Sequence, residues 1–413
     1  MNEQRLLERF VRYVQIDTTA DPRSTNYPSS PGQLRLGKLL VDELQALGIG
    51  DAAQDEHGIV LATLSGTRGR TSPVIVWNAH LDTSPETSGT NVRPQIWRAY
   101  DGRDIVLPAD PTRVLRVAEN PELAQLIGET IITTDGTTLL GADDKAGIAV
   151  IMEAAAWLLE HPEINRPPIR ICFTCDEEIG HGVDHVDVPR LGAVAAYTLD
   201  GAAADQIDLE TFSADLARVT VRGVNIHPSI AKGRMINALR VATAFLDRLP
   251  RTTLAPEVTA DRQGFLHPYQ IEGGVEEVRL SILLRDFDTP KLADLAELLY
   301  SAAAAARAEF PGSAIEVAVT PQYRNMAEGL AREPRAVAFA EQALRRLGRT
   351  PERTVIRGGT DGSRLTELGL PTPNLSTGEH NPHSPLEWTC LKELRLAAEG
   401  FVSLAQVWAD ESC

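Results

Sequence analysis

The sequence predicts an α/β protein in which a central mixed sheet lies between helices and a smaller α+β domain interrupts the chain. Short apolar strands alternate with amphipathic helices from residue 1 to about 209 and again after about 324, an order typical of a sheet covered by helices. Between about 210 and 323 the pattern changes to paired strands with long helices. We therefore expect one domain formed by residues 1–209 and 324–413, and an inserted α+β domain formed by residues 210–323.

The elements of the first segment follow one another in this alternating order. Apolar residues recur at helical spacing at residues 5–14, 33–48 and 146–161. Short apolar runs predict strands at residues 59–66, 73–82, 169–178 and 194–201. Sheets of this kind bind ligands where the strands reach their carboxyl ends. Polar residues directly after these strands are therefore the first candidates for a functional site.

The inserted segment and the return of the chain complete the predicted order. The insert has predicted strands at residues 216–223 and 278–288, and predicted helices from Ile236 to Leu249 and from Pro290 to Phe310. Beyond it, the helix–strand alternation resumes, with a helix at residues 336–348, short runs at 354–362 and 371–377, and a closing helix at 391–410. The first domain is therefore interrupted and then completed.

The composition limits the classes of partner. A formal net charge of -17 repels phosphate backbones and anionic membrane surfaces. The N-terminal segment is charged throughout, which excludes a signal peptide, and no run approaches the roughly 18 apolar residues of a membrane span. We expect a cytoplasmic protein whose partners are small molecules, with neither nucleic acid nor membrane among them.

The cysteines agree with a reducing compartment. The chain has four cysteines without regular spacing, which disfavours a disulfide framework. Cys172 and Cys175 form a CxxC pair, a pattern also found in redox and zinc sites. The segment that carries them reads as a buried strand, in which residues three apart face opposite sides, so we interpret both as structural.

Five short motifs place metal-ligating residue types near predicted strand ends. They are HLD at residues 80–82, GADDKAG at 141–147, CDEEIGHG at 175–182, YTLDG at 197–201 and TGEHNPHSPLEW at 377–388. Each has an ordinary explanation when taken alone, such as helix capping for the paired aspartates. Adjacent carboxylates at Glu177 and Glu178, however, repel one another unless a cation or a proton holds them. In an extended chain Asp82 also faces the same side as His80 and can orient its ring. Together the motifs indicate a metal site.

The ligand chemistry favours zinc. Imidazoles combined with carboxylates suit zinc better than magnesium or calcium. Asp143, Glu178 and Asp200 supply three negative charges against four from two zinc ions, and a bridging hydroxide would neutralise the remainder. Two zinc ions roughly 3.5 to 4 Å apart can activate a water and polarise a peptide carbonyl together. Glu177, left off the metal, is then free to move the water's proton to the leaving amine.

These motifs resemble those of the peptidase T group within the dinuclear zinc peptidases, a superfamily that includes aminoacylases and glutamate carboxypeptidases. The likeness covers nearly the whole chain and is carried by NVRPQIW, TLLGADDKAGIA, DEEIGHG, AYTLDG, NIHPSIAKGRMINA, LLRDFD and IRGGTDGSRL. It implies a metal-dependent aminopeptidase that releases the N-terminal residue of tripeptides. The attacking group would be a zinc-bridging hydroxide, with a glutamate as general base and two Zn²⁺ per chain.

The resemblance also assigns roles to individual residues. The residues that match the metal ligands are His80, Asp143, Glu178, Asp200 and His383, with Asp143 as the bridging ligand. Asp82 and Glu177 match the orienting and base carboxylates, and the bond between Asp143 and Asp144 is expected to be cis. The inserted segment becomes a lid domain. His227, in this segment, matches a residue that stabilises the oxyanion. The residues that match substrate-binding positions are Asn237 and Arg285 in the same segment and Arg357 after it.

The chain departs from the family pattern around the last ligand. Residues 378–382 read GEHNP, where the family usually has glycines and a tyrosine. We take His383 rather than His380 as the ligand because of its HxxxE spacing to Glu387. The rim of the pocket is expected to differ from that of relatives.

Other activities remain as alternatives. A dipeptidase or an acylamino acid deacylase of the same superfamily would share the metals but not the substrate. An alternative of another class is an inactive peptide- or metal-binding protein. Such a protein would have lost a metal ligand or the general base, whereas this sequence has all the matching ligands and the base. The expected partners are short peptides, and the resemblance is compatible with a homodimer formed through the lid domain.

Overall fold

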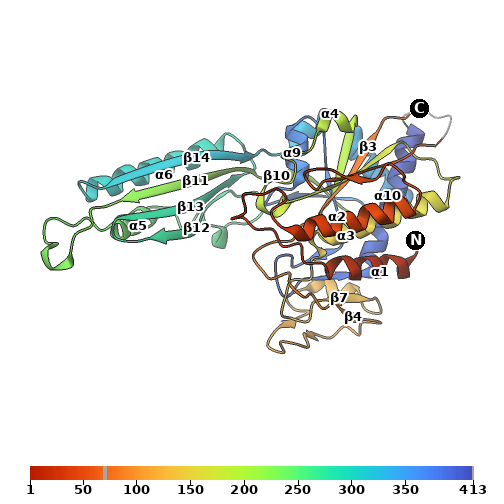
Figure 1. The fold of residues 1–413 in the computed structure, drawn as a ribbon, viewed down its shortest axis with the longest axis horizontal. Coiled ribbons are helices and arrows are strands. Elements are labelled where there is room, and N and C mark those ends of the chain that lie inside the picture. Colours follow the sequence, from red (N-terminus) through yellow and green to blue (C-terminus); the bar gives the residue numbers. More distant parts are fainter. Residues whose placement is uncertain (68–71, 412–413) are drawn as a thin grey trace. The chain divides into compact units, whose positions relative to one another are not determined.

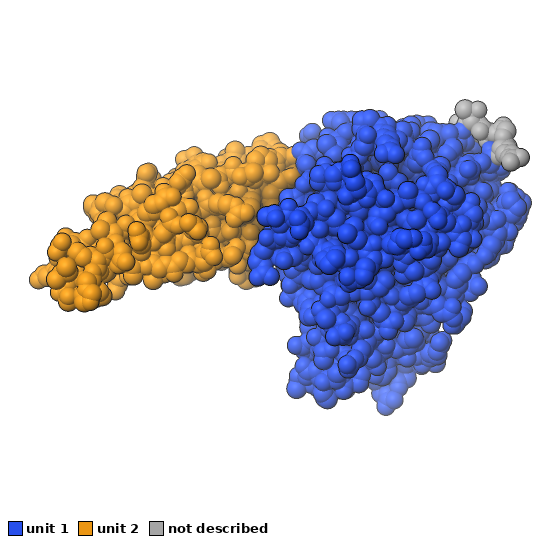
Figure 2. Space-filling model, viewed as in Figure 1, with its two compact units in different colours: residues 1–209, 326–354, 360–413 blue, residues 210–325, 355–359 orange. Residues whose placement is uncertain are grey.

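A computed structural model describes residues 1–67 and 72–411. The chain forms two compact units, which Figure 2 colours separately. Unit 1 comprises residues 1–209, 326–354 and 360–413, and unit 2 comprises residues 210–325 and 355–359. The sequence predicts segment 355–359 as part of the domain formed by residues 1–209 and 324–413. It belongs to unit 2 because the N–H of Phe212 donates to the carbonyls of Ile356 and Gly358.

A mixed eight-stranded sheet forms the centre of unit 1. Its strands, in spatial order, are β1 (Ala53–Gln54), β2 (Val60–Leu64), β8 (Ile169–Thr174), β3 (Ile75–His80), β9 (Ala195–Leu199), β16 (Asn374–Leu375), β10 (Gln206–Thr211) and β15 (Glu352–Ile356). β3 pairs in parallel with both β8 and β9, whereas β2 pairs with β8 in antiparallel orientation. The carboxyl ends of β3, β8 and β9 therefore meet at one edge of the sheet.

Helices cover both faces of this sheet (Figure 1). Those of unit 1 are α1 (Glu3–Val14), α2 (Pro31–Ala46), α3 (Ala142–Glu160), α4 (Val188–Leu191), α7 (Ala327–Leu330), α8 (Arg335–Arg346), α9 (Asp361–Glu367) and α10 (Leu391–Glu411). The larger core cluster joins one face of the sheet to α1, α2, α3, α8 and α10. A smaller cluster on the other face includes Leu191 of α4 and Leu365 of α9.

The two cysteines of the CxxC pair lie on these opposite faces. Cys175 belongs to the larger cluster and Cys172 to the smaller one. Both are buried free thiols. Their structural interpretation is confirmed.

A third group of short strands was not predicted. A four-stranded sheet consists of β17 (Glu379–His380), β18 (Trp388–Cys390), β7 (Ile131–Thr133) and β4 (Gln95–Trp97), and β5 (Ile105–Val106) pairs with β6 (Val114–Leu115). The stretch at residues 137–141, between β7 and α3, forms no strand. Its last two N–H groups, those of Leu140 and Gly141, donate to the side chain of Glu387 instead of to a neighbouring strand.

Unit 2 is an antiparallel sheet covered on one face by two helices. The strands, in spatial order, are β12 (Phe265–Gly273), β13 (Glu277–Asp286), β11 (Ser213–Arg222) and β14 (Ala314–Tyr323), and the helices are α5 (Ala238–Leu246) and α6 (Lys291–Glu309). Apolar side chains from these helices and from the sheet form a separate core. The outer strands β12 and β14 were missed because most of their side chains are exposed or half-buried, which weakens the apolar signal.

In the described part of the chain, no helix is both long and apolar enough to cross a bilayer.

Candidate metal centre

The five predicted ligands lie at the ends of elements in unit 1. His80 is the last residue of β3, Asp143 lies in the first turn of α3, Glu178 in the short 3₁₀ turn after β8, Asp200 directly after β9, and His383 between β17 and β18. Parallel strands bring their carboxyl ends together, which explains how residues far apart in sequence meet here.

Two groups of potential ligands share one carboxylate. His80, Asp143 and Asp200 form the first group, and Asp143, Glu178 and His383 form the second, with the ligand atoms of each group within 4.8 Å of one another. Asp143 Oδ1 lies 2.9 Å from Nε2 of His80, and its Oδ2 lies 3.2 Å from Nε2 of His383. These are the two groups of this kind in residues 1–67 and 72–411. The two oxygens of Asp143 thus face different groups, as a bridging ligand requires.

The electrostatics of the cluster fit a bound cation. Burial raises the pKa of Glu178 to about 7, and the charge of Asp143 adds to this effect while His383 opposes it. Burial also raises the pKa of Asp200 well above its usual range, again with a contribution from Asp143. Oε1 of Glu178 is buried without a hydrogen-bond partner. Crowded, desolvated carboxylates with an unpaired oxygen are stabilised by a metal ion.

The two predicted catalytic carboxylates lie beside these groups. Asp82 is fully buried, and its Oδ1 is 3.3 Å from Nδ1 of His80. Its two oxygens also accept the N–H groups of Glu177 and Glu178, at 3.1 and 3.0 Å. Asp82 therefore ties the end of β3 to the turn that carries both glutamates. Burial raises the pKa of Glu177 well above its usual range, and His80 opposes this rise.

The start of α3 has an unusual backbone. The bond between Asp143 and Asp144 is cis, as expected from the resemblance, and both residues have non-helical φ and ψ angles. Asp144 accepts the N–H of His80 through Oδ2 at 3.0 Å and the N–H of Gly147 through Oδ1 at 3.1 Å. Asp144 thus links the end of β3 to α3 rather than joining either ligand group.

Comparison with known proteins identifies the family to which the chain belongs. The model described as peptidase family M20/M25/M40 matches residues 134–407, which include Asp143 and His383. The chain belongs to this peptidase family.

Full-length relatives of this M20 chain are peptidases T, which confirms the predicted resemblance. Peptidase T of Geobacillus thermodenitrificans (strain NG80-2) is 43% identical over 410 residues, which cover 99% of this chain and 100% of the relative. Peptidase T of Bacillus subtilis (strain 168) is 43% identical over 404 residues, 98% of each chain.

Solved structures share the fold. Aminopeptidase PepT from Bacillus cereus superposes with a TM-score of 0.75 at 24% identity, covering 99% of this chain and 100% of that one. A tripeptidase from Staphylococcus aureus gives 0.77 at 24% identity, covering 99% of both chains. A dinuclear metal-binding peptidase of the M20 family from Bacillus subtilis gives 0.65 at 15% identity, covering 100% of this chain and 99% of that one. The predicted fold class is confirmed.

Within this M20 chain the loop around the last ligand separates two histidines. His383 contacts Asp143 and also lies 2.9 Å from Glu178 Oε2. His380 instead stacks on Trp388 with ring centroids 3.7 Å apart, and its Nε2 is 2.8 Å from a carboxylate oxygen of Glu393. The residue chosen by its spacing is therefore the one beside the ligand groups.

Two buried carboxylates near the ligands were not singled out from the sequence. Glu379 is 4% exposed and accepts a hydrogen bond from Thr377, and burial together with the charges of neighbouring aspartates raises its pKa well above its usual range. Asp361 is also buried, and burial raises its pKa to about 6. Asp361 lies in the motif IRGGTDGSRL, which gave a signal for the segment but not for the residue.

The four predicted substrate-binding residues lie in unit 2 and form two separate pairs. His227 is exposed on a turn beyond the end of β11, and Asn237 caps the first turn of α5. Arg285 lies on β13 opposite Phe265, whose ring also faces the guanidinium of Arg357 at 5.6 Å. The roles of all four toward a substrate remain predictions.

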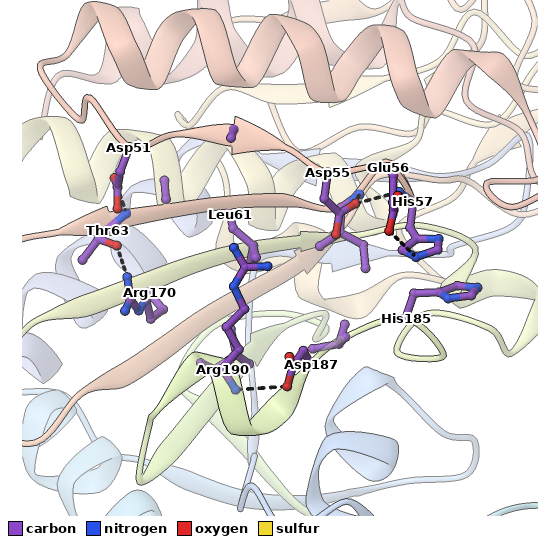
Figure 3. Close-up of a pocket in the computed structure, with 15 residues that line it drawn as sticks. Asp51, Asp55, Glu56, His57, Leu61, Thr63, Arg170, His185, Asp187 and Arg190 are labelled. Carbon is purple, nitrogen blue, oxygen red and sulfur yellow. Dashed lines mark hydrogen bonds and ion pairs between the residues drawn. The ribbon is translucent and has the colours of Figure 1, made fainter.

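A cavity of about 720 Å³ lies elsewhere in unit 1, beside β2 and α4 (Figure 3). Figure 3 shows Arg190 extending from α4 toward Leu61 of β2, with His57 and His185 together at one end. The cavity is lined by both acidic and basic side chains. None of the lining side chains has a buried polar atom without a hydrogen-bond partner. None of the ligands lines this cavity, so we assign it no role in the chemistry.

Proposed function

We propose that this chain is a metal-dependent aminopeptidase that releases the N-terminal residue from tripeptides. The observation that carries the proposal is the pair of ligand groups that share Asp143, with Glu177 beside them. The full-length identity of 43% to peptidases T supports the substrate class. All predicted ligands and both catalytic carboxylates are present, which disfavours an inactive binding protein.

Two Zn²⁺ ions are the proposed cofactors. His80, Asp143 and Asp200 would hold one ion, and Asp143, Glu178 and His383 would hold the other. When bound, such ions polarise a peptide carbonyl and lower the pKa of a water.

The carboxylates of the chain move the proton. Glu177 accepts a proton from the attacking water at its carboxylate and delivers it to the nitrogen of the leaving amine, as the water oxygen bonds to the carbonyl carbon and the peptide C–N bond breaks. Asp82, at Nδ1 of His80, keeps Nε2 of that ring directed at Asp143. The products are a free amino acid and a dipeptide.

Unit 1 is the proposed catalytic domain and unit 2 the proposed lid. In the lid, His227 would stabilise the oxyanion and Asn237 would contact the substrate, while Arg285 or Arg357 would bind its terminal carboxylate. Arg357 is the predicted carboxylate partner. Its two Nη groups already donate to carbonyl and hydroxyl oxygens of residues 259–263, and a substrate would have to compete with these bonds.

The proposal extends to location and assembly. The described cysteines Cys172, Cys175 and Cys390 are free and buried, which supports a cytoplasmic location. A homodimer formed through unit 2 is supported by the separation of its two residue pairs, because one copy of the sheet presents them at opposite ends.

A substrate series tests the function. Dipeptides, tripeptides and tetrapeptides with a free amine are compared with the matching N-acetylated set, in the presence of zinc and after chelation. We expect release of the N-terminal residue from free-amine tripeptides in the presence of metal. Equally fast cleavage of N-acetyl tripeptides would refute the aminopeptidase assignment and favour a deacylase, and preferred cleavage of dipeptides would favour a dipeptidase.

A further inference from the structure

A buried carboxylate outside both ligand groups binds the backbone at the bridging ligand. Glu387 is 1% exposed. Its Oε2 accepts the N–H groups of Leu140 and Gly141 at 2.6 and 2.8 Å, and its Oε1 accepts the N–H of Asp143 at 3.1 Å. One side chain thus holds three backbone donors at the point where α3 begins.

We propose that Glu387 is a positioning residue that fixes the backbone of Asp143 so that its two side-chain oxygens reach both ligand groups. The inference rests on the proposed function for the identity of those ligands. The φ and ψ angles of Asp143 lie outside the range of the helix that follows, and its N–H donates to Glu387. A small rotation of its backbone would move one oxygen away from His80 or from His383.

The turn that carries Glu387 also carries a ligand. His383 contacts Oδ2 of Asp143, so residues 383–387 hold Asp143 both by its side chain and by its backbone. The turn is closed by bonds from the N–H of Glu387 to Ser384 O at 3.0 Å and from the N–H of Leu386 to Ser384 Oγ at 3.1 Å. This arrangement gives a physical reason for the HxxxE spacing, since Glu387 accepts backbone N–H groups at the start of α3 while His383 contacts the side chain of Asp143.

A carboxylate suits this position better than an amide. The first N–H groups of a helix have no partner within the helix and need external acceptors. Both oxygens of a glutamate accept, whereas a glutamine would direct its NH₂ group at one of the three donors. A plain capping role would explain the bonds but would affect only stability, whereas a positioning role also affects how tightly the metals bind.

The test compares three full-length variants. Glu387→Gln removes one accepting oxygen, Glu387→Asp keeps the charge on a shorter side chain, and Glu393→Gln is the control because this buried carboxylate bonds to His380 rather than to the start of α3. Zinc affinity is measured by competition with a chromophoric chelator, together with thermal unfolding of the metal-free proteins and kcat and KM on a tripeptide.

We expect Glu387→Gln to weaken zinc affinity by about 10- to 100-fold, the usual effect of removing a partner behind the ligands. kcat should fall while KM changes by less than about threefold, Glu387→Asp should recover part of the affinity, and Glu393→Gln should leave it within about twofold. Wild-type zinc affinity in Glu387→Gln, or a loss no larger than that of Glu393→Gln, would overturn the proposal. If Glu387→Gln does not fold, wild-type zinc affinity in Glu387→Asp would overturn the proposal. Absence of metal-dependent cleavage by the wild type would instead refute the proposed function.

Discussion

Adjacent glutamates after β8 have different surroundings although they share one turn. The N–H groups of both bind Asp82. Oε2 of Glu178 lies against His383, and Glu178 belongs to a ligand group. Glu177 belongs to neither group. The two carboxylates therefore differ in their access to a metal, and their functions can be separated by mutation.

Glu177→Gln should retain two zinc ions and lose at least about 100-fold in kcat, the usual scale for general acid–base catalysis. An amide of the same shape cannot take the proton, yet it leaves the ligands in place. Glu178→Gln should instead bind less metal. Metal analysis and steady-state rates on both variants check this division, which equal loss of metal from both would contradict.

Arg357→Ala should impair cleavage of free-acid tripeptides by about 10- to 150-fold in kcat/KM, because a charge-assisted contact is worth about 1.5 to 3 kcal/mol. The C-terminal amides of the same tripeptides should be affected much less. Arg285→Ala is the matched variant, since this arginine lies at the same end of the unit 2 sheet. Equal losses on acid and amide would remove Arg357 from carboxylate recognition, and a selective loss in Arg285→Ala alone would transfer that role.

At the scale of elements, the signal in the sequence depends on length and burial. The strands β3, β8 and β9 have five or six residues each and are almost wholly buried, so each gives a continuous apolar run. Strands of three residues such as β4, β7 and β18 cover barely more than one period of a strand, so they left no signal. Their positions depend on tertiary pairing.

The same distinction applies to the centre. The candidate ligands that follow β3, β8 and β9 could be predicted because the sequence showed where these strands end. The hydrogen bonds of Glu387 and Asp144 could not be predicted, because every residue except proline has a backbone N–H that can donate to a carboxylate, whatever the separation along the chain. Spacing selected His383, which lies beside Asp143, although Glu387 bonds to the backbone of Asp143.

The contact between α3 and β9 depends on a glycine. A Cβ at Gly147 would lie 2.2 Å from the carbonyl oxygen of Leu199 and 2.3 Å from Oδ1 of Asp144. Gly147→Ala should therefore destabilise the fold by about 1 to 3 kcal/mol, the usual cost of overpacking, and weaken metal binding by displacing Asp144. Gly50→Ala, where a Cβ meets nothing within 4 Å, is the control for denaturant unfolding. Equal stability of the two variants would contradict this account.

At the scale of the whole molecule, the two pairs of predicted substrate-binding residues bear on the proposed assembly. Arg285 pairs with Ala214 near the start of β11, whereas His227 lies beyond Arg222 at its other end. From Ala214 to Arg222 the strand advances about 27 Å at its normal rise per residue. A tripeptide is far shorter than this distance. One substrate cannot contact both ends of a single copy of unit 2, so use of both pairs at one catalytic centre requires a second chain.

Mixing two inactive variants tests this requirement. His227→Ala lacks the proposed oxyanion partner and Glu177→Gln lacks the proposed base, so we expect neither variant alone to have a complete centre. If His227 acts on the centre of its partner, each heterodimer has one centre in which both residues are intact, and subunit exchange should restore about a quarter of the wild-type rate per chain. The rate is measured on a free tripeptide after the variants are unfolded together and refolded, with each variant refolded alone as control. Failure to recover activity, with dimers present by light scattering, would show that His227 and Glu177 act within one chain. Full activity of His227→Ala refolded alone would show instead that His227 has no catalytic role.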